Sequence, residues 1–277
     1  MRFLLVFLLI CAGLRGASLP LPSGIIDAQY SEALNEIVMI LSDANALYLY
    51  DPASGTESTI SLSYAPLGLS VTPDGDYAAV MHDGWVSYVN LQSHAVETYE
   101  TGIASGSIVL SVDGIYVFPD SQGGPSYLDF AWGPPFGASN AVQASSAAVN
   151  PASNAIFAIR SDISPAGLAK VDVSNGYPSG TTQETADNEH RLCGNIWISP
   201  DGNSIYTGCG TVFNASDMSY AASLGGLGQV QSLSVSSSQV AAIPSPSDGP
   251  DTEVWLYSST DFSTPQRFVL PDGGHGK

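Results

Sequence analysis

The segment Ser70-Val71-Thr72-Pro73-Asp74-Gly75-Asp76-Tyr77 places an Asp-Gly turn between two short runs of apolar, β-branched and aromatic residues. The same arrangement returns in Ile198-Ser199-Pro200-Asp201-Gly202-Asn203-Ser204-Ile205-Tyr206. Asp-Gly flanked by alternating apolar residues is a strong short-range signal for a hairpin. Each segment is therefore predicted to be two β-strands joined by a tight turn.

Related turns recur at intervals of roughly 36 to 48 residues, near 33–35, at 74–75 and 113–114, near 153–154, at 201–202 and near 237. A second hairpin follows in each unit and is clearest around the turn at residues 51–55. Four antiparallel strands in about 40 to 45 residues is the period of a β-propeller blade. Blades arranged radially bury both faces of each sheet and leave only short edges.

We therefore predict an all-β fold, a β-propeller of four-stranded antiparallel blades. Six blade units are expected, at residues 25–63, 64–102, 103–141, 142–190, 191–225 and 226–271. A β-sandwich also joins short strands by turns, but it needs no fixed period. The regular recurrence of the Asp-Gly unit favours the propeller.

Residues 48–56 and 68–75 resemble the YVTN-type propeller repeats of secreted and surface-layer bacterial proteins. The first looks like that family's strand, D-x-x-[ST]-G turn and strand, and the second like its innermost hairpin. The resemblance covers most of residues 27–270, although the Tyr-Val-Thr-Asn tetrapeptide itself is absent. It implies a scaffold whose members include lactone hydrolases, subunits of redox enzymes and binding proteins. Such rings commonly close with seven blades, so the closure of a six-unit ring, complete or lacking a seventh blade, is left open.

An apolar run from Phe3 to Gly13 follows Arg2 at the N-terminus. It is shorter than the about 20 residues that span a bilayer, and it is typical of a secretory signal. We predict a signal peptide at 1–18, a propeller domain at 19–277, no transmembrane segment and a secreted or extracytoplasmic location, in the periplasm or at the cell surface. Cys11 is an alternative lipid-attachment site, but Ile10 before it fits that signal poorly, and ordinary cleavage is favoured.

Removal of residues 1–18 would leave 5 basic against 26 acidic residues. Nucleic acids and anionic headgroups are bound through Lys and Arg that neutralise phosphate. A nucleic-acid partner is therefore not expected. The partner classes that fit are a protein, a glycan or a small molecule.

Cys193 and Cys209 flank the Asp201-Gly202 turn at eight residues on either side of Asp201. An antiparallel hairpin sets them opposite or one place apart, within disulfide range, and export would oxidise them. A metal site or a reactive dithiol are the alternatives. The absence of a CxxC motif and a single nearby histidine, His190, favour the structural bridge.

In a propeller, the loops between the second and third strands share a face with the inter-blade connections. Acidic residues and histidines are expected on this face, and they form our candidate ligand or cation site: Asp43, His82, Asp83, Asp120, Asp162, Asp187, Glu189, His190, Asp248 and Asp251. Converging carboxylates would suit Ca²⁺, which takes oxygen ligands. The alternative is ordinary turn chemistry, because Asp favours turns on either face, and no cofactor is then expected.

The chain has no GxSxG, HExxH, GxxxxGK[ST] or CxxCH motif. A non-catalytic binding or surface scaffold is therefore the favoured function, and no catalytic residue is assigned. The alternative is a metal-assisted, lactonase-like hydrolase that activates water through His82 with Asp83, or through His190 with Asp187 and Glu189. A third hypothesis is a piece of a larger assembly in which another chain completes the ring.

Overall fold

The structure, a computed structural model, describes residues 24–104, 106–119, 124–134, 136–138, 144–160, 166–178, 182–186, 189–245 and 253–269. The predicted signal peptide at 1–18 and Cys11 lie outside the described residues. Within them, no helix has the length and apolar character needed to cross a bilayer.

The described residues form six sheets of four antiparallel strands, and in each sheet the strands lie side by side in chain order. The predicted β-propeller is confirmed. The six innermost strands are β1 (Ile25–Ser31), β5 (Gly68–Val71), β9 (Gly106–Leu110), β13 (Ser146–Val149), β17 (Ile196–Ile198) and β21 (Val230–Val235). The second strands are β2 (Glu36–Leu41), β6 (Tyr77–Met81), β10 (Gly114–Pro119), β14 (Ala155–Arg160), β18 (Ser204–Thr207) and β22 (Gln239–Pro244).

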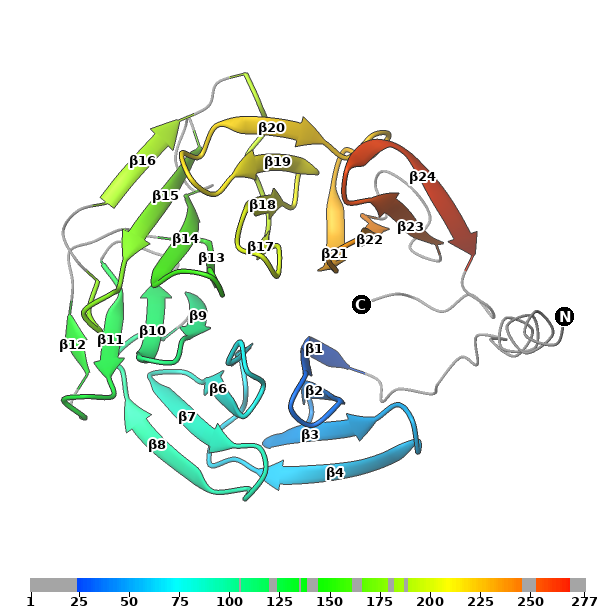
Figure 1. The fold of residues 1–277 in the computed structure, drawn as a ribbon. Coiled ribbons are helices and arrows are strands. Elements are labelled where there is room, and N and C mark those ends of the chain that lie inside the picture. The colour runs from blue at the N-terminus through cyan, green and yellow to red at the C-terminus, as the bar shows by residue number, and fades with distance from the viewer. Residues whose placement is uncertain are drawn as a thin grey trace, which may run out of the picture.

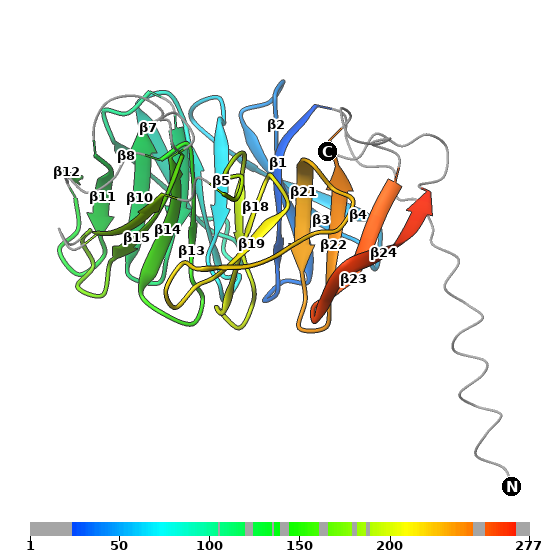
Figure 2. The ribbon, with the colours of Figure 1, turned by 90° about the horizontal axis from the view of Figure 1, so that it is seen from above.

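The third strands are β3 (Ala46–Asp51), β7 (Trp85–Asn90), β11 (Ser126–Asp129), β15 (Gly167–Asp172), β19 (Thr211–Asn214) and β23 (Glu253–Ser258). The outermost strands are β4 (Thr56–Ser61), β8 (Val96–Glu100), β12 (Gly137–Ala138), β16 (Thr182–Ala186), β20 (Tyr220–Ser223) and β24 (Asp261–Val269). We number the blades 1 to 6 in chain order. Figure 1 looks down the ring with the inner strands around its centre, and Figure 2 shows the ring edge-on.

Apolar side chains that alternate along the strands fill the spaces between neighbouring blades. Five buried clusters join blade 1 to 2, 2 to 3, 3 to 4, 4 to 5 and 5 to 6. Between blades 4 and 5, for example, Phe157 and Phe213 are both fully buried. Among the described residues no such cluster joins blade 6 back to blade 1. The ring in Figure 1 is correspondingly open between these two blades.

The recurring Asp-Gly turn packs against the preceding blade. Gly75 has a φ of +82°, and a Cβ at this position would lie 2.8 Å from the backbone nitrogens of Glu32 and Ala33 in blade 1. The Ser31 hydroxyl donates a hydrogen bond to the Gly75 carbonyl oxygen at 2.6 Å. Gly202 in blade 5 repeats this arrangement, because its carbonyl accepts a 2.8 Å hydrogen bond from the Asn150 amide of blade 4. Glycine is needed here both for the turn and for the close approach of the neighbouring blade.

Candidate functional site

The inner strands of all six blades surround an axial cavity of about 980 Å³. Each inner strand pairs with its own blade along one edge, and its other edge faces the axis. The lining of the cavity is therefore mainly backbone, small side chains and neutral polar groups. The lining residues with neutral hydroxyl or amide side chains include Gln29, Ser42, Ser70, Ser107, Ser145, Ser146, Asn195, Gln231, Ser232 and Ser234. Trp197 and Tyr30 are the aromatic residues of the lining, and Trp197 also packs against the apolar cluster between blades 5 and 6. The cavity can therefore offer both hydrogen bonds and an apolar contact to one ligand.

Asp27 is the single charged residue among the described residues that line the cavity. Its carboxylate accepts hydrogen bonds from the backbone N–H groups of Ala28, at 2.8 Å, and Leu69, at 3.2 Å. Burial raises the pKa of Asp27 above its usual value, and these two hydrogen bonds oppose that rise. The Asp27 carboxylate thus connects blade 1 to blade 2.

The inner serines connect neighbouring blades in a similar way. The hydroxyl oxygen of Ser70 accepts the Leu110 N–H at 2.8 Å, that of Ser107 the Ala147 N–H at 3.1 Å, and that of Ser146 the Ile196 N–H at 3.2 Å; each donor belongs to the next blade. A hydroxyl that accepts such a bond still has its own hydrogen to donate. Among the described residues no acceptor is found for these three hydrogens. They are available to a ligand or to water in the cavity.

Gln29 connects blades 1 and 2 through both ends of its side-chain amide. The amide nitrogen donates to the Leu69 carbonyl and the amide oxygen accepts the Val71 N–H, each at 2.9 Å. The side chain of Asn195, by contrast, has no partner among the described residues and is exposed toward the same cavity. Asn195 therefore offers an amide donor and acceptor that the fold does not use.

His82, a member of the predicted acidic face, is fully buried. Its Nδ1 lies 2.9 Å from the Ala65 carbonyl oxygen and its Nε2 lies 2.8 Å from the Ser87 hydroxyl. Burial lowers the pKa of the imidazole, and the hydrogen bond to Ala65 opposes this only in part. Both ring nitrogens are used within blade 2, so His82 holds the loop before β7 to its own sheet.

Four other predicted members of this face lie in the part of the chain that the structure describes. Asp43, Asp83 and Glu189 are exposed, and the His190 ring stacks on Tyr220 of the outer strand β20, with ring centroids 3.6 Å apart. Across the described ranges no three His, Cys, Asp or Glu side chains gather in a way that could hold a metal ion. The remaining five predicted members lie outside the described residues: Asp120, Asp162, Asp187, Asp248 and Asp251.

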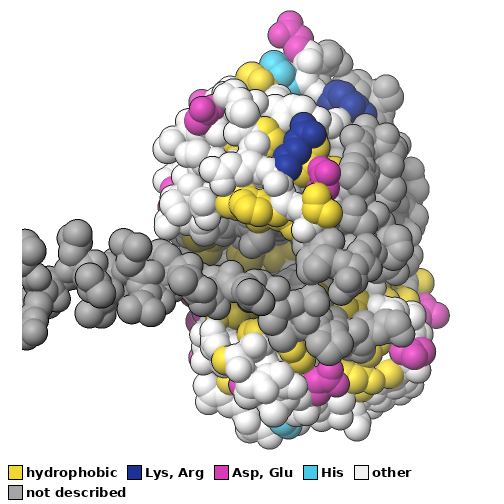
Figure 3. Space-filling model, turned by 90° about the vertical axis from the view of Figure 1, so that its right-hand side faces the viewer, with side chains coloured by type: hydrophobic (Ala, Val, Ile, Leu, Met, Phe, Trp, Pro, Cys, Tyr) yellow, Lys and Arg dark blue, Asp and Glu magenta, His cyan; other side chains and the backbone are white. Residues whose placement is uncertain are grey.

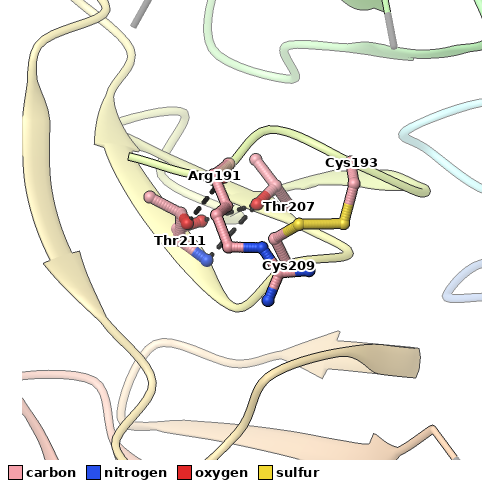
Figure 4. Close-up of a disulfide and its surroundings, with 5 residues drawn as sticks. All are labelled: Arg191, Cys193, Thr207, Cys209 and Thr211. Atoms are coloured by element: carbon pink, nitrogen blue, oxygen red, sulfur yellow. Dashed lines mark hydrogen bonds between the residues drawn. A yellow bond between two sulfur atoms is a disulfide. The ribbon is translucent and has the colours of Figure 1, made fainter. Parts of the chain in front are cut away.

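The predicted disulfide between Cys193 and Cys209 is confirmed, with the two Cα atoms 5.3 Å apart. It joins the connection entering blade 5 to the turn between β18 and β19, so the two cysteines lie one place apart in the extended register of β17 and β18. In Figure 4, Arg191 lies beside this bridge, and its carbonyl oxygen accepts a 2.8 Å hydrogen bond from the Thr211 hydroxyl. The bridge therefore holds the chain entering blade 5 against the β18–β19 turn of the same blade.

The cavity residues were not among our predicted site residues, but the sequence contains a signal for them. The equivalent residues at the start of four hairpin turns are Ser31, Thr72, Ser111 and Asn150. Gln29 and Ser70 stand two residues before this position, and Asp27, Ser107 and Ser146 stand four residues before it. A polar side chain at these positions interrupts an otherwise apolar inner strand. Aligning the units on their turns would have found all five.

No family model matches the chain, and no curated protein matches it. Similar solved structures exist. A chain of "Crystal Structure of Mitotic Checkpoint Complex" has a TM-score of 0.65 and 16% identity, over 90% of this chain and 82% of that one. A chain of "Dihydro-heme d1 dehydrogenase NirN in complex with DHE" has a TM-score of 0.63 and 17% identity, over 90% of this chain and 56% of that one. The present chain thus spans little more than half of the second structure, and these likenesses support the propeller fold alone.

Proposed function

We propose that this protein is a non-catalytic binding propeller whose axial cavity takes a neutral, hydroxyl-rich ligand such as an uncharged oligosaccharide. The observation that carries the proposal is the lining of the cavity. Its lining includes hydroxyl and amide groups, the aromatic residues Trp197 and Tyr30, and a single charged residue, Asp27, among the described residues. Sugars are bound by this combination, because their hydroxyls need donors and acceptors while their C–H faces pack on aromatic rings.

The neutral cavity contrasts with the acidity of the chain as a whole, which has 26 acidic and 7 basic residues. A cationic ligand would be expected to meet several carboxylates, and a phosphorylated one would need Lys or Arg. The described lining provides neither set. The disulfide is consistent with an extracytoplasmic location, where free glycans and cell-surface glycans are available.

The proposal is tested by titrating the purified full chain with a panel of neutral, acidic and amino oligosaccharides, using isothermal calorimetry. Neutral members should bind, and substitution Asn195→Ala or Trp197→Ala should weaken that binding about tenfold, the loss expected for one aromatic or hydrogen-bonding contact. Trp132→Ala is the matched control, because Trp132 is 85% exposed and lies outside the cavity.

Two outcomes would count against the proposal. Loss of binding in Trp132→Ala but not in the two cavity variants would move the site to the outer surface. Release of cleaved product during a long incubation with the bound sugar, or with lactones, would favour the hydrolase alternative.

A further inference from the structure

Blades 1 and 6 each carry a sheet face that no described residue of another blade covers. From β1 through β21, the inner strand of each blade packs beside the inner strand of the next, but no comparable contact joins β21 to β1. Figure 3 looks at this side of the ring and shows hydrophobic side chains on both sides of a recess. The two faces can be compared, position by position, with faces that are covered elsewhere in the ring.

On blade 1, the open face is formed by alternate residues of β1. In the hairpin register, Ala28 and Tyr30 occupy the positions that Leu69 and Val71 hold in blade 2. Blade 1 covers Leu69 and Val71, leaving them 3% and 8% exposed. Tyr30 is 52% exposed, Ile26 on the same face is 44% exposed, and Ala28 is also exposed. The face is apolar at the positions where a preceding blade would pack.

On blade 6, the open face is the one turned away from blade 5. Ala241 and Ile243 occupy the positions of Ala79 and Met81 in blade 2, which blade 3 covers to 0% and 2% exposure. In blade 6 both are only half-buried, as are the neighbouring Val254 and Leu256, and Phe268 is 50% exposed. Five apolar side chains thus form a face of the kind that receives a following blade.

The hydrogen bonds between inner strands are also incomplete at both faces. The inner strands of blades 2 to 5 each receive a side-chain acceptor from the preceding blade, on the N–H groups of Val71, Leu110, Ala147 and Ile196. The N–H of Tyr30, which corresponds to those of Val71 and Leu110, has no such acceptor among the described residues. Ser232 and Ser234 on β21 occupy the positions of Asp27 and Gln29 on β1, and their hydroxyls have no hydrogen-bond partner among the described residues. The side-chain amide oxygen of Gln231 is buried and receives no hydrogen bond.

We propose that the space between blades 6 and 1 is a docking site for one further four-stranded β-blade, which none of the described residues supplies. The occupant must present one apolar face to blade 1 and another to blade 6, and it must offer a polar side chain that accepts the Tyr30 N–H. No single described blade of a second copy meets this requirement, because each has at most one open face. The inference does not rest on the proposed axial ligand, although Tyr30, Gln231, Ser232 and Ser234 also line the axial cavity.

The test uses the full chain carrying, after Lys277, a second copy of residues 64–104 as the probe blade. This copy has the two faces that the walls require, since blades 1 and 3 cover them in its original place. We expect a rise in Tm of about 5 °C or more, the shift produced by one to three kcal/mol in a domain of this size. We also expect loss of most of the binding of the dye ANS, and hydrogen exchange at the Tyr30 amide slowed about tenfold or more.

A protease site placed between Val269 and the probe then shows whether a separate chain can stay bound. After cleavage of the folded protein, the probe should co-elute with the ring in gel filtration. The control probe carries Val80→Asp and Met81→Asp in the copy alone, so the rest of the chain is unchanged, and it should give none of these effects.

Three outcomes would overturn the proposal. One is an unextended chain that already protects the Tyr30 amide and binds no ANS, because blades 6 and 1 would then close on each other. Another is concentration-dependent dimerisation that abolishes ANS binding, since a second copy would then cover the faces. The third is a probe that changes nothing, or that dissociates on cleavage.

Discussion

Replacing Gly75 by alanine should destabilise the protein far more than the same change at Gly55, although both glycines have positive φ, of +82° and +72°. A Cβ at Gly55 would meet nothing within 4 Å, whereas at Gly75 it would meet the Glu32 and Ala33 backbone nitrogens at 2.8 Å and the Ser31 hydroxyl at 2.9 Å. The left-handed conformation costs an alanine about 1–2 kcal/mol at either site. Both substitutions also reduce the conformational freedom of the unfolded chain by a similar amount, so this effect cancels in the comparison.

Gly75→Ala adds the cost of displacing backbone, about 1–3 kcal/mol for an overpacked contact. It also strains the hydrogen bond from Ser31 to Gly75, whose net contribution is about 0.5–1.5 kcal/mol. We therefore expect Gly75→Ala to lower the free energy of unfolding by about 2–4 kcal/mol more than Gly55→Ala.

Urea unfolding of both variants measures this difference through the midpoint at unchanged slope. Adding Ser31→Ala should recover part of the loss in Gly75→Ala and none in Gly55→Ala, because only the former approaches Ser31. Equal losses in the two glycine variants would refute the view that the recurring Asp-Gly turn is a contact between blades.

Three further predictions concern the disulfide, His82 and Asp201. Reduction of the bridge, or Cys193→Ser with Cys209→Ser, should lower the free energy of unfolding by at most about 3 kcal/mol, the chain-entropy value for a loop of this length. The loss is limited because β17 and β18 already restrain the hairpin, and a larger loss in urea unfolding would contradict this. The lowered pKa of buried His82 means that the unfolded state takes up its proton first, so its stabilising effect is complete above the usual histidine pKa of about 6.5 and is lost as pH falls below it. Thermal melts from pH 8 to 5 should show a shallower fall for His82→Gln than for the unmodified protein, and parallel curves would contradict this assignment. Hydrogen bonds from Ser199 and Asn203 lower the pKa of Asp201, so its contribution is present above the usual carboxyl pKa of about 4 and is lost as pH falls below it; Asp201→Asn should flatten the acid side of the stability curve, and an unchanged acid limb would argue against it.

The fold was predictable because its main signal is local. The Asp-Gly turn, the alternation of the flanking residues and the regular spacing define hairpins before any long-range contact is known, and the six predicted units match the six sheets. The disulfide was predictable for the same reason. Cys193 and Cys209 flank one hairpin, so antiparallel pairing alone brings them together.

The axial site was harder to predict because its contacts join residues far apart in the sequence. Gln29 acts on Leu69 and Val71, and Ser107 acts on Ala147, so each polar group stands about one blade away from its partner. Read locally, such a residue looks like an interruption of an apolar strand.

His82 shows the opposite problem. In the sequence His82 and Asp83 form a polar pair in a loop, and only the fold shows that the ring turns inward to the Ala65 carbonyl and the Ser87 hydroxyl.

The central claim, ligand binding in the axial cavity, is tested most directly by hydrogen–deuterium exchange of the full chain with and without the tightest-binding neutral oligosaccharide. Binding at the axis should slow exchange in the inner strands of several blades, with β1, β13 and β17 among them, and leave the segment around Trp132 unchanged. Protection confined to that segment or to the outer strands would contradict the claim.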